Sequence, residues 1–143
     1  MELFERLCHE RGERCTVQRR RILEGVLSRD DHPTADQVFE VVRKRLPDLA
    51  MPTVYRTLEY LVRVGVITKA CHTGRATRYD PRIDLHHHLV CLQCSRLIDF
   101  EDAGLDRLTI PETAHVGFEV TDFRVQLRGS CRTCREDERK ETS

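Results

Sequence analysis

Two pairs of cysteines constrain this chain more than any other feature of its sequence. Cys91 with Cys94 and Cys131 with Cys134 each have the CxxC spacing, and 36 residues separate the two pairs. Two thiolates at this spacing bind one metal ion from a tight turn, and two such turns complete a closed tetrahedral site. We therefore predict that these four cysteines hold a structural zinc ion. The segment between the pairs is long enough to contain a helix and a strand.

Redox chemistry is the alternative use of these thiols. A thioredoxin-like site needs a single CxxC pair at the N-terminus of a helix, so it leaves the second pair unexplained. Cys8, Cys15 and Cys71 are scattered along the chain, and a thiol-redox function for them stays open. Disulfides are not expected, because the sequence begins with the charged segment MELFERLCHERGERC rather than a secretory signal.

The composition is that of a folded protein without a membrane span. The 143 residues are 39% hydrophobic and 34% charged, which suits one domain or two small domains that share stability. No window approaches the roughly 18 consecutive apolar residues that a spanning helix needs. We therefore expect a cytoplasmic protein.

Basic and acidic residues, 24 of each, cancel over the whole chain but not within each half. Residues 1–81 carry 15 basic and 12 acidic side chains, whereas residues 82–143 carry 9 and 12. The neutral total therefore does not exclude a nucleic-acid partner, because the small positive excess in the first half permits DNA binding.

The first half has the pattern of a winged helix-turn-helix. Apolar residues recur at helical spacing in four segments, the third of which begins with the capping-box pair Thr34 and Gln37. A hairpin with a polar tip follows the fourth segment. A generic small helical domain is the alternative. The expected helices span residues 3–11, 16–28, 34–45 and 51–64, and the expected strands span 66–71 and 76–79.

The fourth of these helices carries the residues that favour DNA recognition. Thr53, Tyr55, Arg56 and Thr57 occupy non-core positions at its N-terminal end. Hydroxyls, an aromatic ring and a guanidinium suit contacts with phosphates and with base edges in a major groove. Arg19 lies on the outer face of the second helix, and we include it in the DNA-binding set.

The second half predicts an α/β domain, so we place the domain boundary between residues 1–81 and 82–143. Its expected order is strand, strand, helix, strand, with a charged tail that frays. The alternation of the last strand slips between Val120 and Phe123, which predicts a bulge there. The expected strands are 86–91, 95–100 and 118–127, the helix is 102–114, and the tail is 135–143.

A run of three histidines precedes the first cysteine pair. In a strand, His86 and His88 share one face and His87 points away. A hairpin turn at residues 92–93 sets His86 opposite Asp99, and Asp80 is near enough in sequence to add an oxygen. The sequence thus predicts a nitrogen and oxygen metal site, with a polar, exposed strand face as the alternative.

Four motifs together resemble the ferric uptake regulator family of bacterial metal-dependent repressors. They are HPTAD at residues 32–36, TVYRTL at 53–58, HHHLVCLQC at 86–94 and the second CxxC pair. The resemblance implies a homodimer with an N-terminal winged helix, a C-terminal dimerisation domain and structural zinc on the four cysteines. It also implies that Tyr55 and Arg56 contact DNA. The family's TPQR motif is TVQR here, with Val17 in place of proline.

The resemblance further implies a regulatory site that joins the two domains. Its positions carry aspartates at 80 and 99, which is similar to the peroxide-stress regulators of the family, and it has no thiolate, which suits Fe(II) or Mn(II). Members with a third metal site have histidine where this chain has Phe123, so we expect that site to be missing. The implied ligands are His32, Asp80, His86, His88 and Asp99.

These inferences predict a repressor that binds a pseudo-palindromic operator in double-stranded DNA when Fe(II) or Mn(II) is bound. We expect peroxide sensing through metal-catalysed histidine oxidation, with an iron- or manganese-uptake regulator as the alternative. A bound ion would hold the two domains so that two recognition helices reach major-groove faces roughly 34–36 Å apart. We expect no enzyme activity. An iron enzyme with a site made of two histidines and one carboxylate is the alternative from another class.

Overall fold

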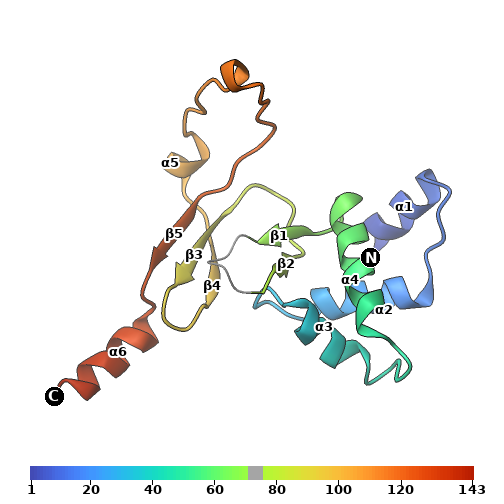
Figure 1. Ribbon diagram of the computed structural model, residues 1–143, viewed down its shortest axis with the longest axis horizontal. Coiled ribbons are helices and arrows are strands. Elements are labelled where there is room, and N and C mark those ends of the chain that lie inside the picture. The colour runs from blue at the N-terminus through green and yellow to red at the C-terminus, as the bar shows by residue number, and fades with distance from the viewer. Residues whose placement is uncertain (71–75) are drawn as a thin grey trace. The chain divides into compact units, whose positions relative to one another are not determined.

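Two compact units, Met1–Ile83 and Asp84–Ser143, make up the computed structural model, which describes residues 1–70 and 76–143. Helices and a two-stranded sheet form the first unit, and a three-stranded sheet with short helices forms the second (Figure 1). The first unit contains α1 (Glu2–Glu10), α2 (Val17–Leu27), α3 (Ala35–Val42), α4 (Met51–Arg63), β1 (Thr68–Ala70) and β2 (Arg78–Asp80). The second contains β3 (His87–Cys91), β4 (Leu97–Phe100), α5 (Ala103–Asp106), the 3₁₀ turn η1 (Ala114–Val116), β5 (Gln126–Gly129) and α6 (Arg132–Glu141).

Side-chain caps fix where two helices of the first unit begin. Thr16 precedes α2, and its hydroxyl accepts a hydrogen bond from the amide of Arg19 at 3.2 Å. Thr34 and Gln37 form both bonds of a capping box at the start of α3, at 3.3 and 2.9 Å, as predicted. Both helices therefore start where the hydroxyls replace missing backbone acceptors.

Glycine ends α1 and α4. Gly12 and Gly65 have φ of +63° and +82°, a region that costs glycine nothing. The amide after each glycine donates to a carbonyl of the last helical turn, so Glu13 bonds Cys8 at 2.9 Å and Val66 bonds Leu61 at 3.0 Å. The chain can therefore leave each helix sharply and return to the core.

The core of the first unit is apolar and continuous across all four helices. Most apolar residues of these helices are buried, although Leu27 of α2 is 47% exposed. Strands β1 and β2 pair antiparallel, with Thr68 opposite Asp80, and the predicted hairpin tip at residues 72–75 lies outside the described residues. The largest fully buried side chains of this core are Phe4, Ile22, Leu23, Leu58, Leu61, Ile67 and Tyr79.

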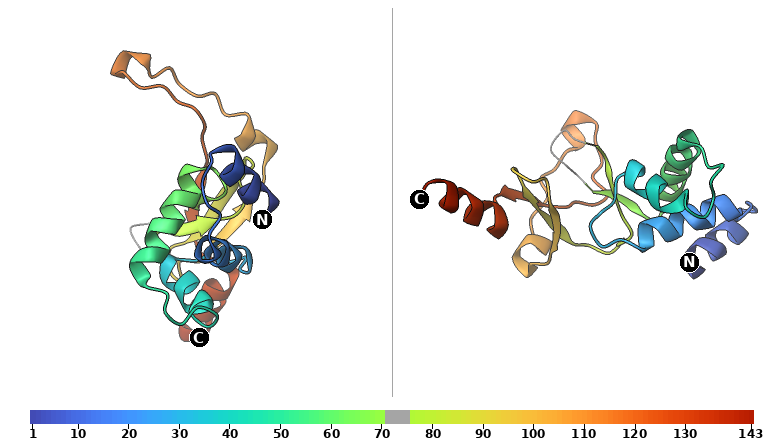
Figure 2. Two further views of the ribbon diagram at one scale, coloured as in Figure 1. Left: turned by 90° about the vertical axis from the view of Figure 1, so that its right-hand side faces the viewer. Right: turned by 90° about the horizontal axis from the view of Figure 1, so that it is seen from below.

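In the second unit, the sheet has the strand order β4-β3-β5. Strand β3 pairs antiparallel with β4 and parallel with β5. The chain between β4 and β5 makes a long excursion away from the sheet, with η1 at its far end (Figures 1 and 2). This crossover is needed because parallel neighbours cannot be joined by a tight turn.

Three sequence predictions for the second unit are wrong. The helix expected over residues 102–114 ends at Asp106, because the following positions are exposed and lead through Thr109 and Ile110 into Pro111. The strand expected over 118–127 overlaps β5 only at residues 126–127, and the bulge expected near residues 120–123 does not form because no strand is present there. The tail expected to fray is the helix α6, which Cys131 precedes as N-cap residue.

None of the described helices has the length and apolar character needed to cross a membrane.

Close packing of α2 against α3 depends on Gly25. A Cβ atom at this position would lie 2.8 Å from Val42 Cγ2 and 3.2 Å from Val38 Cγ1. Because valine side chains are stiff, we expect Gly25→Leu to lower the free energy of unfolding by about 1–3 kcal/mol. Urea denaturation would measure the change. Val17→Leu, at an exposed position of the same helix, is the control and should change stability by less than about 0.5 kcal/mol.

Candidate metal centres and nucleic-acid interface

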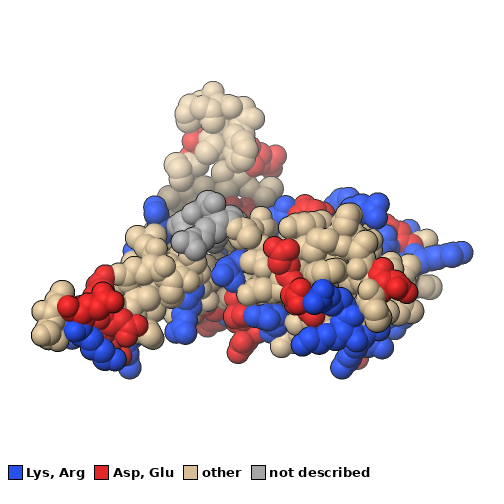
Figure 3. All heavy atoms as spheres, turned by 60° about the horizontal axis from the view of Figure 1, so that its bottom comes forward, with Lys and Arg blue, Asp and Glu red and all other residues tan. Residues whose placement is uncertain are grey.

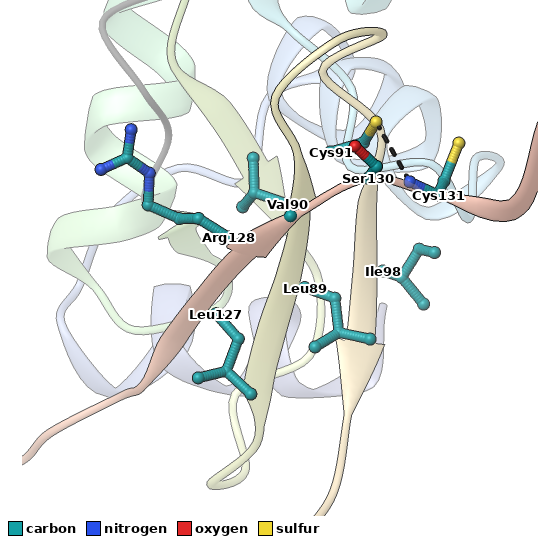
Figure 4. Close-up of a pocket in the computed structure, with 9 residues that line it drawn as sticks. Leu89, Val90, Cys91, Ile98, Leu127, Arg128, Ser130 and Cys131 are labelled. Carbon is teal, nitrogen blue, oxygen red and sulfur yellow. Dashed lines mark hydrogen bonds between the residues drawn. The ribbon is translucent and has the colours of Figure 1, made fainter. Parts of the chain in front are cut away.

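The four cysteines of the two CxxC pairs converge at one end of the three-stranded sheet. Cys91 ends β3, Cys94 lies in the following turn, and Cys131 and Cys134 lie at the start of α6. Figure 4 shows Cys91 and Cys131 side by side, with the amide of Cys131 donating to Cys91 Sγ at 3.4 Å. Sγ separations are 3.8 Å for Cys91 with Cys134 and for Cys94 with Cys131, and all four sulfurs lie within 4.8 Å of one another.

These separations fit a tetrahedral zinc ion. Sulfurs bound at about 2.3 Å to a tetrahedral centre are about 3.8 Å apart. The amides of Cys94 and Cys131 donate to Cys91 and lower its pKa to about 6. Hydrogen bonding of the protonated Cys134 thiol to Cys131, together with burial, raises the pKa of Cys134 to about 12. A divalent cation is what lets all four thiols ionise together.

The turn that carries the first cysteine pair shifts the strand register. Cys91 N donates to Arg96 O at 3.0 Å and Ser95 N donates to Cys91 O at 2.9 Å, so the loop between the strands has four residues, 92–95, rather than two. Asp99 therefore lies opposite His88, and the predicted pairing of His86 with Asp99 is wrong by two residues. An even shift keeps every side chain on its face, so the three groups still lie on one side of the sheet.

His86, His88 and Asp99 direct their ligand atoms to one point of the second unit. His86 Nε2 lies 3.1 Å from His88 Nε2, and Asp99 Oδ1 lies 3.4 and 3.2 Å from these two nitrogens. His86 Nδ1 is 2.8 Å from the carbonyl of Asp84, so this nitrogen carries the proton and Nε2 presents a lone pair. A metal ligand oriented by a backbone carbonyl has this arrangement.

In the first unit, His32 and Asp80 form another group of side chains that can bind a metal. His32 Nε2 lies 3.6 Å from Asp80 Oδ2, and the two residues are 4% and 1% exposed. Asp80 Oδ1 accepts the amide of Arg82 at 2.8 Å, which orients the carboxylate. Imidazole and carboxylate together suit a divalent cation of intermediate or hard character.

His87 lies on the opposite face of β3 and makes no metal cluster among the described residues. Its Nδ1 accepts the amide of Val125 at 3.0 Å, so Nε2 carries the proton and donates to Asp106 at 2.7 Å. Its ring stacks on Phe123, with centroids 6.2 Å apart. These contacts of His87 anchor α5 and the segment before β5 to the central strand β3.

The N-terminal end of α4 presents most of the predicted DNA-contacting side chains. Tyr55 is 48% exposed, Arg56 is exposed and Thr53 is half-buried, whereas Thr57 is only 6% exposed and belongs to the core. A hollow of about 470 Å³ lies between α4 and the start of α2, and Thr53 and Arg56 line it. Figure 3 shows basic and acidic side chains interspersed over this unit, so no continuous positive surface covers the face in view.

Arg19 lines the same hollow but is held by the protein. Its guanidinium lies 3.9 Å above the ring of Tyr60, 3.5 Å from the carboxylate of Glu13 and 3.0 Å from the carbonyl of Arg14. These contacts tie the start of α2 to α4. Arg19 therefore packs against the predicted DNA-reading helix, and its assignment as a DNA contact stays a prediction.

Several residues that support these sites were not evident from the sequence. The carbonyl of Asp84 orients His86, and no sequence signal marks a backbone acceptor. The hydroxyl of Tyr79 donates to Glu59 of α4 at 3.2 Å, and burial beside that carboxylate raises the Tyr79 pKa to about 12. This bond links the strand that carries Asp80 to the helix that carries Tyr55.

Known proteins share both the sequence pattern and the fold. Residues 10–128 match the model of the ferric uptake regulator family. The chain is 28% identical over 126 residues to the peroxide-responsive repressor PerR of Staphylococcus epidermidis, across 88% of this chain and 84% of that protein. The Campylobacter jejuni peroxide stress regulator is 27% identical with a TM-score of 0.64, covering 82% of this chain and 88% of that one.

The Helicobacter pylori ferric uptake regulator has the same fold. Its TM-score is 0.76 at 19% identity, over 94% of this chain and 92% of that chain. The predicted α+β fold, a winged-helix unit followed by an α/β unit, is therefore confirmed.

Removing one sulfur tests the zinc cluster. We expect Cys131→Ser to lose its zinc and to unfold the second unit at lower temperature, because three thiols leave the tetrahedron open. Zinc measured by native mass spectrometry and unfolding followed by circular dichroism would report both changes. Cys15→Ser, outside the cluster, should keep its zinc. A Cys131→Ser protein that retains stoichiometric zinc would contradict the assignment.

Proposed function

This chain belongs to the ferric uptake regulator family, and from this premise we propose that it is a cytoplasmic, metal-dependent transcriptional repressor. Its structural metal is zinc and its regulatory metal is Fe(II) or Mn(II). It acts as a homodimer on a pseudo-palindromic operator in double-stranded DNA. The observation that carries this proposal is the set of imidazole and carboxylate groups, free of thiols, on the two sides of the unit boundary.

The chain is a regulator rather than an enzyme. Its family and its relatives with known function are metal-responsive and peroxide-responsive regulators. The alternative of an iron enzyme with two histidines and one carboxylate rested on His86, His88 and Asp99 alone, and we assign these groups to the regulatory site instead.

Both sides of the boundary contribute to the proposed regulatory site. His32 and Asp80 supply one imidazole and one carboxylate, and His86, His88 and Asp99 supply two imidazoles and one carboxylate. Nitrogen and oxygen donors without thiolate favour Fe(II) or Mn(II) over softer metals. The family resemblance supports assigning all five residues to one ion.

A single ion with ligands from both units would restrict their relative orientation. In a homodimer this restriction selects the spacing at which two α4 helices reach successive major-groove faces, roughly 34–36 Å apart. The metal would bind more tightly to the orientation that completes its ligand set, and so it would stabilise that orientation over the others. Thr53, Tyr55 and Arg56 then read the groove, and Arg19 supports α4.

The second unit has the surface of a dimerisation domain. Many of its large apolar side chains are exposed, and an apolar hollow of about 210 Å³ is lined by residues that include Leu89, Ile98 and Leu127 (Figure 4). Apolar surface of this extent favours burial against a second copy. The exposed large apolar residues of this unit are Leu85, Leu92, Ile98, Leu108, Ile110, Val116, Phe118, Val120 and Leu127.

Peroxide responsiveness is the finer part of the proposal. Aspartate at positions 80 and 99 and the similarity to peroxide-responsive repressors support it. Fe(II) at this site would supply the electron that cleaves the O–O bond of peroxide, and we expect His32 or His86 to take up one oxygen atom while the other leaves as water. Regulation of iron or manganese uptake without peroxide sensing is the alternative.

Loss of two regulatory ligands should abolish metal-dependent DNA binding. We expect the His86→Ala, His88→Ala protein to lose at least about 10-fold in operator affinity at Mn(II) concentrations that saturate the wild type, because the second unit keeps one ligand. Mobility shift with a pseudo-palindromic duplex would measure this. His115→Ala, a histidine on the excursion, is the matched control. Equal binding by the double variant would refute the regulatory assignment.

Peroxide should distinguish the two metals. We expect peroxide to inactivate the Fe(II) form and to spare the Mn(II) form, with one oxygen atom added to His32 or His86. Peptide mass spectrometry would locate the added mass of about 16 Da, which is one oxygen atom, and we expect about one such addition per chain. Absence of oxidation on either histidine would leave metal sensing alone as the function.

A further inference from the structure

His32 has a left-handed backbone conformation, which is uncommon for a residue other than glycine. Its φ is +55°, and His32 and Ser95 are the two non-glycine residues with positive φ among the described residues. Left-handed backbone at a non-glycine residue persists where surrounding contacts hold it, and it is concentrated at functional sites. The imidazole of His32 therefore depends on whatever fixes the loop before α3.

Arg78 holds this loop from strand β2. Its Nη1 donates to the carbonyl of His32 at 3.0 Å and to the carbonyl of Asp31 at 3.4 Å. A guanidinium that donates to two successive carbonyls fixes the peptide between them, because both oxygens must face the same group. Since that peptide precedes the left-handed residue, Arg78 stabilises the conformation that directs the His32 side chain.

Backbone contacts add a second constraint to the same loop. The amide of Tyr79 donates to the carbonyl of Pro33 at 2.9 Å, and Thr34 forms a bridge with Arg78. The loop thus lies along β2 as an additional strand-like segment. Because Asp80 ends β2, the element that holds the His32 backbone also carries the carboxylate 3.6 Å from the His32 imidazole.

Arg78 donates hydrogen bonds to backbone oxygens of the loop rather than to a carboxylate. Asp31, the nearest acidic residue in the loop, makes a two-bond ion pair with Arg29 at 2.8 and 2.5 Å, which lowers the Asp31 pKa. Among the described residues, the side chain of Arg78 donates hydrogen bonds to the carbonyl oxygens of Asp31 and His32. A charged donor half-buried on backbone oxygens has a geometric role, since carbonyls give it direction without neutralising its charge.

We infer that Arg78 is a positioning residue of the regulatory metal site, which sets metal affinity by holding His32 in its left-handed conformation. This inference rests on the proposed function, in which His32 is a ligand. It assigns Arg78 neither metal contact nor a direct contact with DNA. Partners that orient a metal ligand typically contribute 10-fold to 100-fold to metal affinity.

Mn(II) titration of the full-length, zinc-loaded protein tests the inference. We expect Arg78→Met to raise the Mn(II) dissociation constant by about 10-fold to 100-fold, measured from the electron paramagnetic resonance signal of free Mn(II). At saturating Mn(II), its operator affinity should return to the wild-type value, because the recognition helix is unchanged. Arg78→Lys, which keeps one charged donor, should show a smaller shift. Arg45→Met, at an exposed arginine of the same unit, should leave the Mn(II) affinity unchanged.

The outcomes distinguish a failure of the positioning role of Arg78 from a failure of the proposed function. An unchanged Mn(II) affinity in Arg78→Met overturns the positioning role. Weaker operator binding at saturating Mn(II), or a lower melting temperature of the metal-free first unit, also overturns it, because a DNA contact or a general structural role would then explain the effect. A wild-type protein that binds its operator equally with and without Mn(II) would instead contradict the proposed function.

Discussion

The convergence of four cysteine sulfurs is the constraint on which the second unit depends. The hydrophobic residues buried in this unit, among those described, are Val90, Cys91 and Leu97. A core this small cannot offset the conformational entropy of ordering a sheet, a long excursion and a terminal helix. A zinc ion bound by all four thiolates joins the end of β3, its turn and α6, and so supplies energy that apolar burial does not.

The first unit depends on a different balance. Its four helices bury a continuous apolar core, so the helix that carries Thr53, Tyr55 and Arg56 is rigid without a metal ion. Strand β2 connects helix α4 to the pair formed by His32 and Asp80. The hydroxyl of Tyr79 donates to Glu59 of α4, and the residue after Tyr79 is Asp80. The net charge of this unit is small, so we expect its orientation, rather than its overall field, to be the main determinant of DNA affinity.

Agreement between sequence and structure follows the range of the interactions involved. The capping box at Thr34 and the glycine that ends α4 are local, and both were predictable within a few residues of chain. The helix expected to reach residue 114 failed because amphipathic spacing was present but no core was available to bury it. The pairing of Asp99 was wrong by two residues because the CxxC turn is longer than a hairpin turn, yet the face was right because strands alternate with period two.

Residue types and their spacing in the sequence determined the chemistry of this protein: four thiols for zinc, imidazoles and carboxylates for a harder ion, and a helix suited to the major groove. Only the tertiary structure decided how these groups are aimed. Three contacts have no signature in the periodicity of the sequence. They are the carbonyl of Asp84 with His86, the guanidinium of Arg78 with the His32 loop, and Arg19 with Tyr60. The physical reason is that a ligand's identity is a property of one residue, whereas its direction is set by backbone and side-chain contacts made after folding.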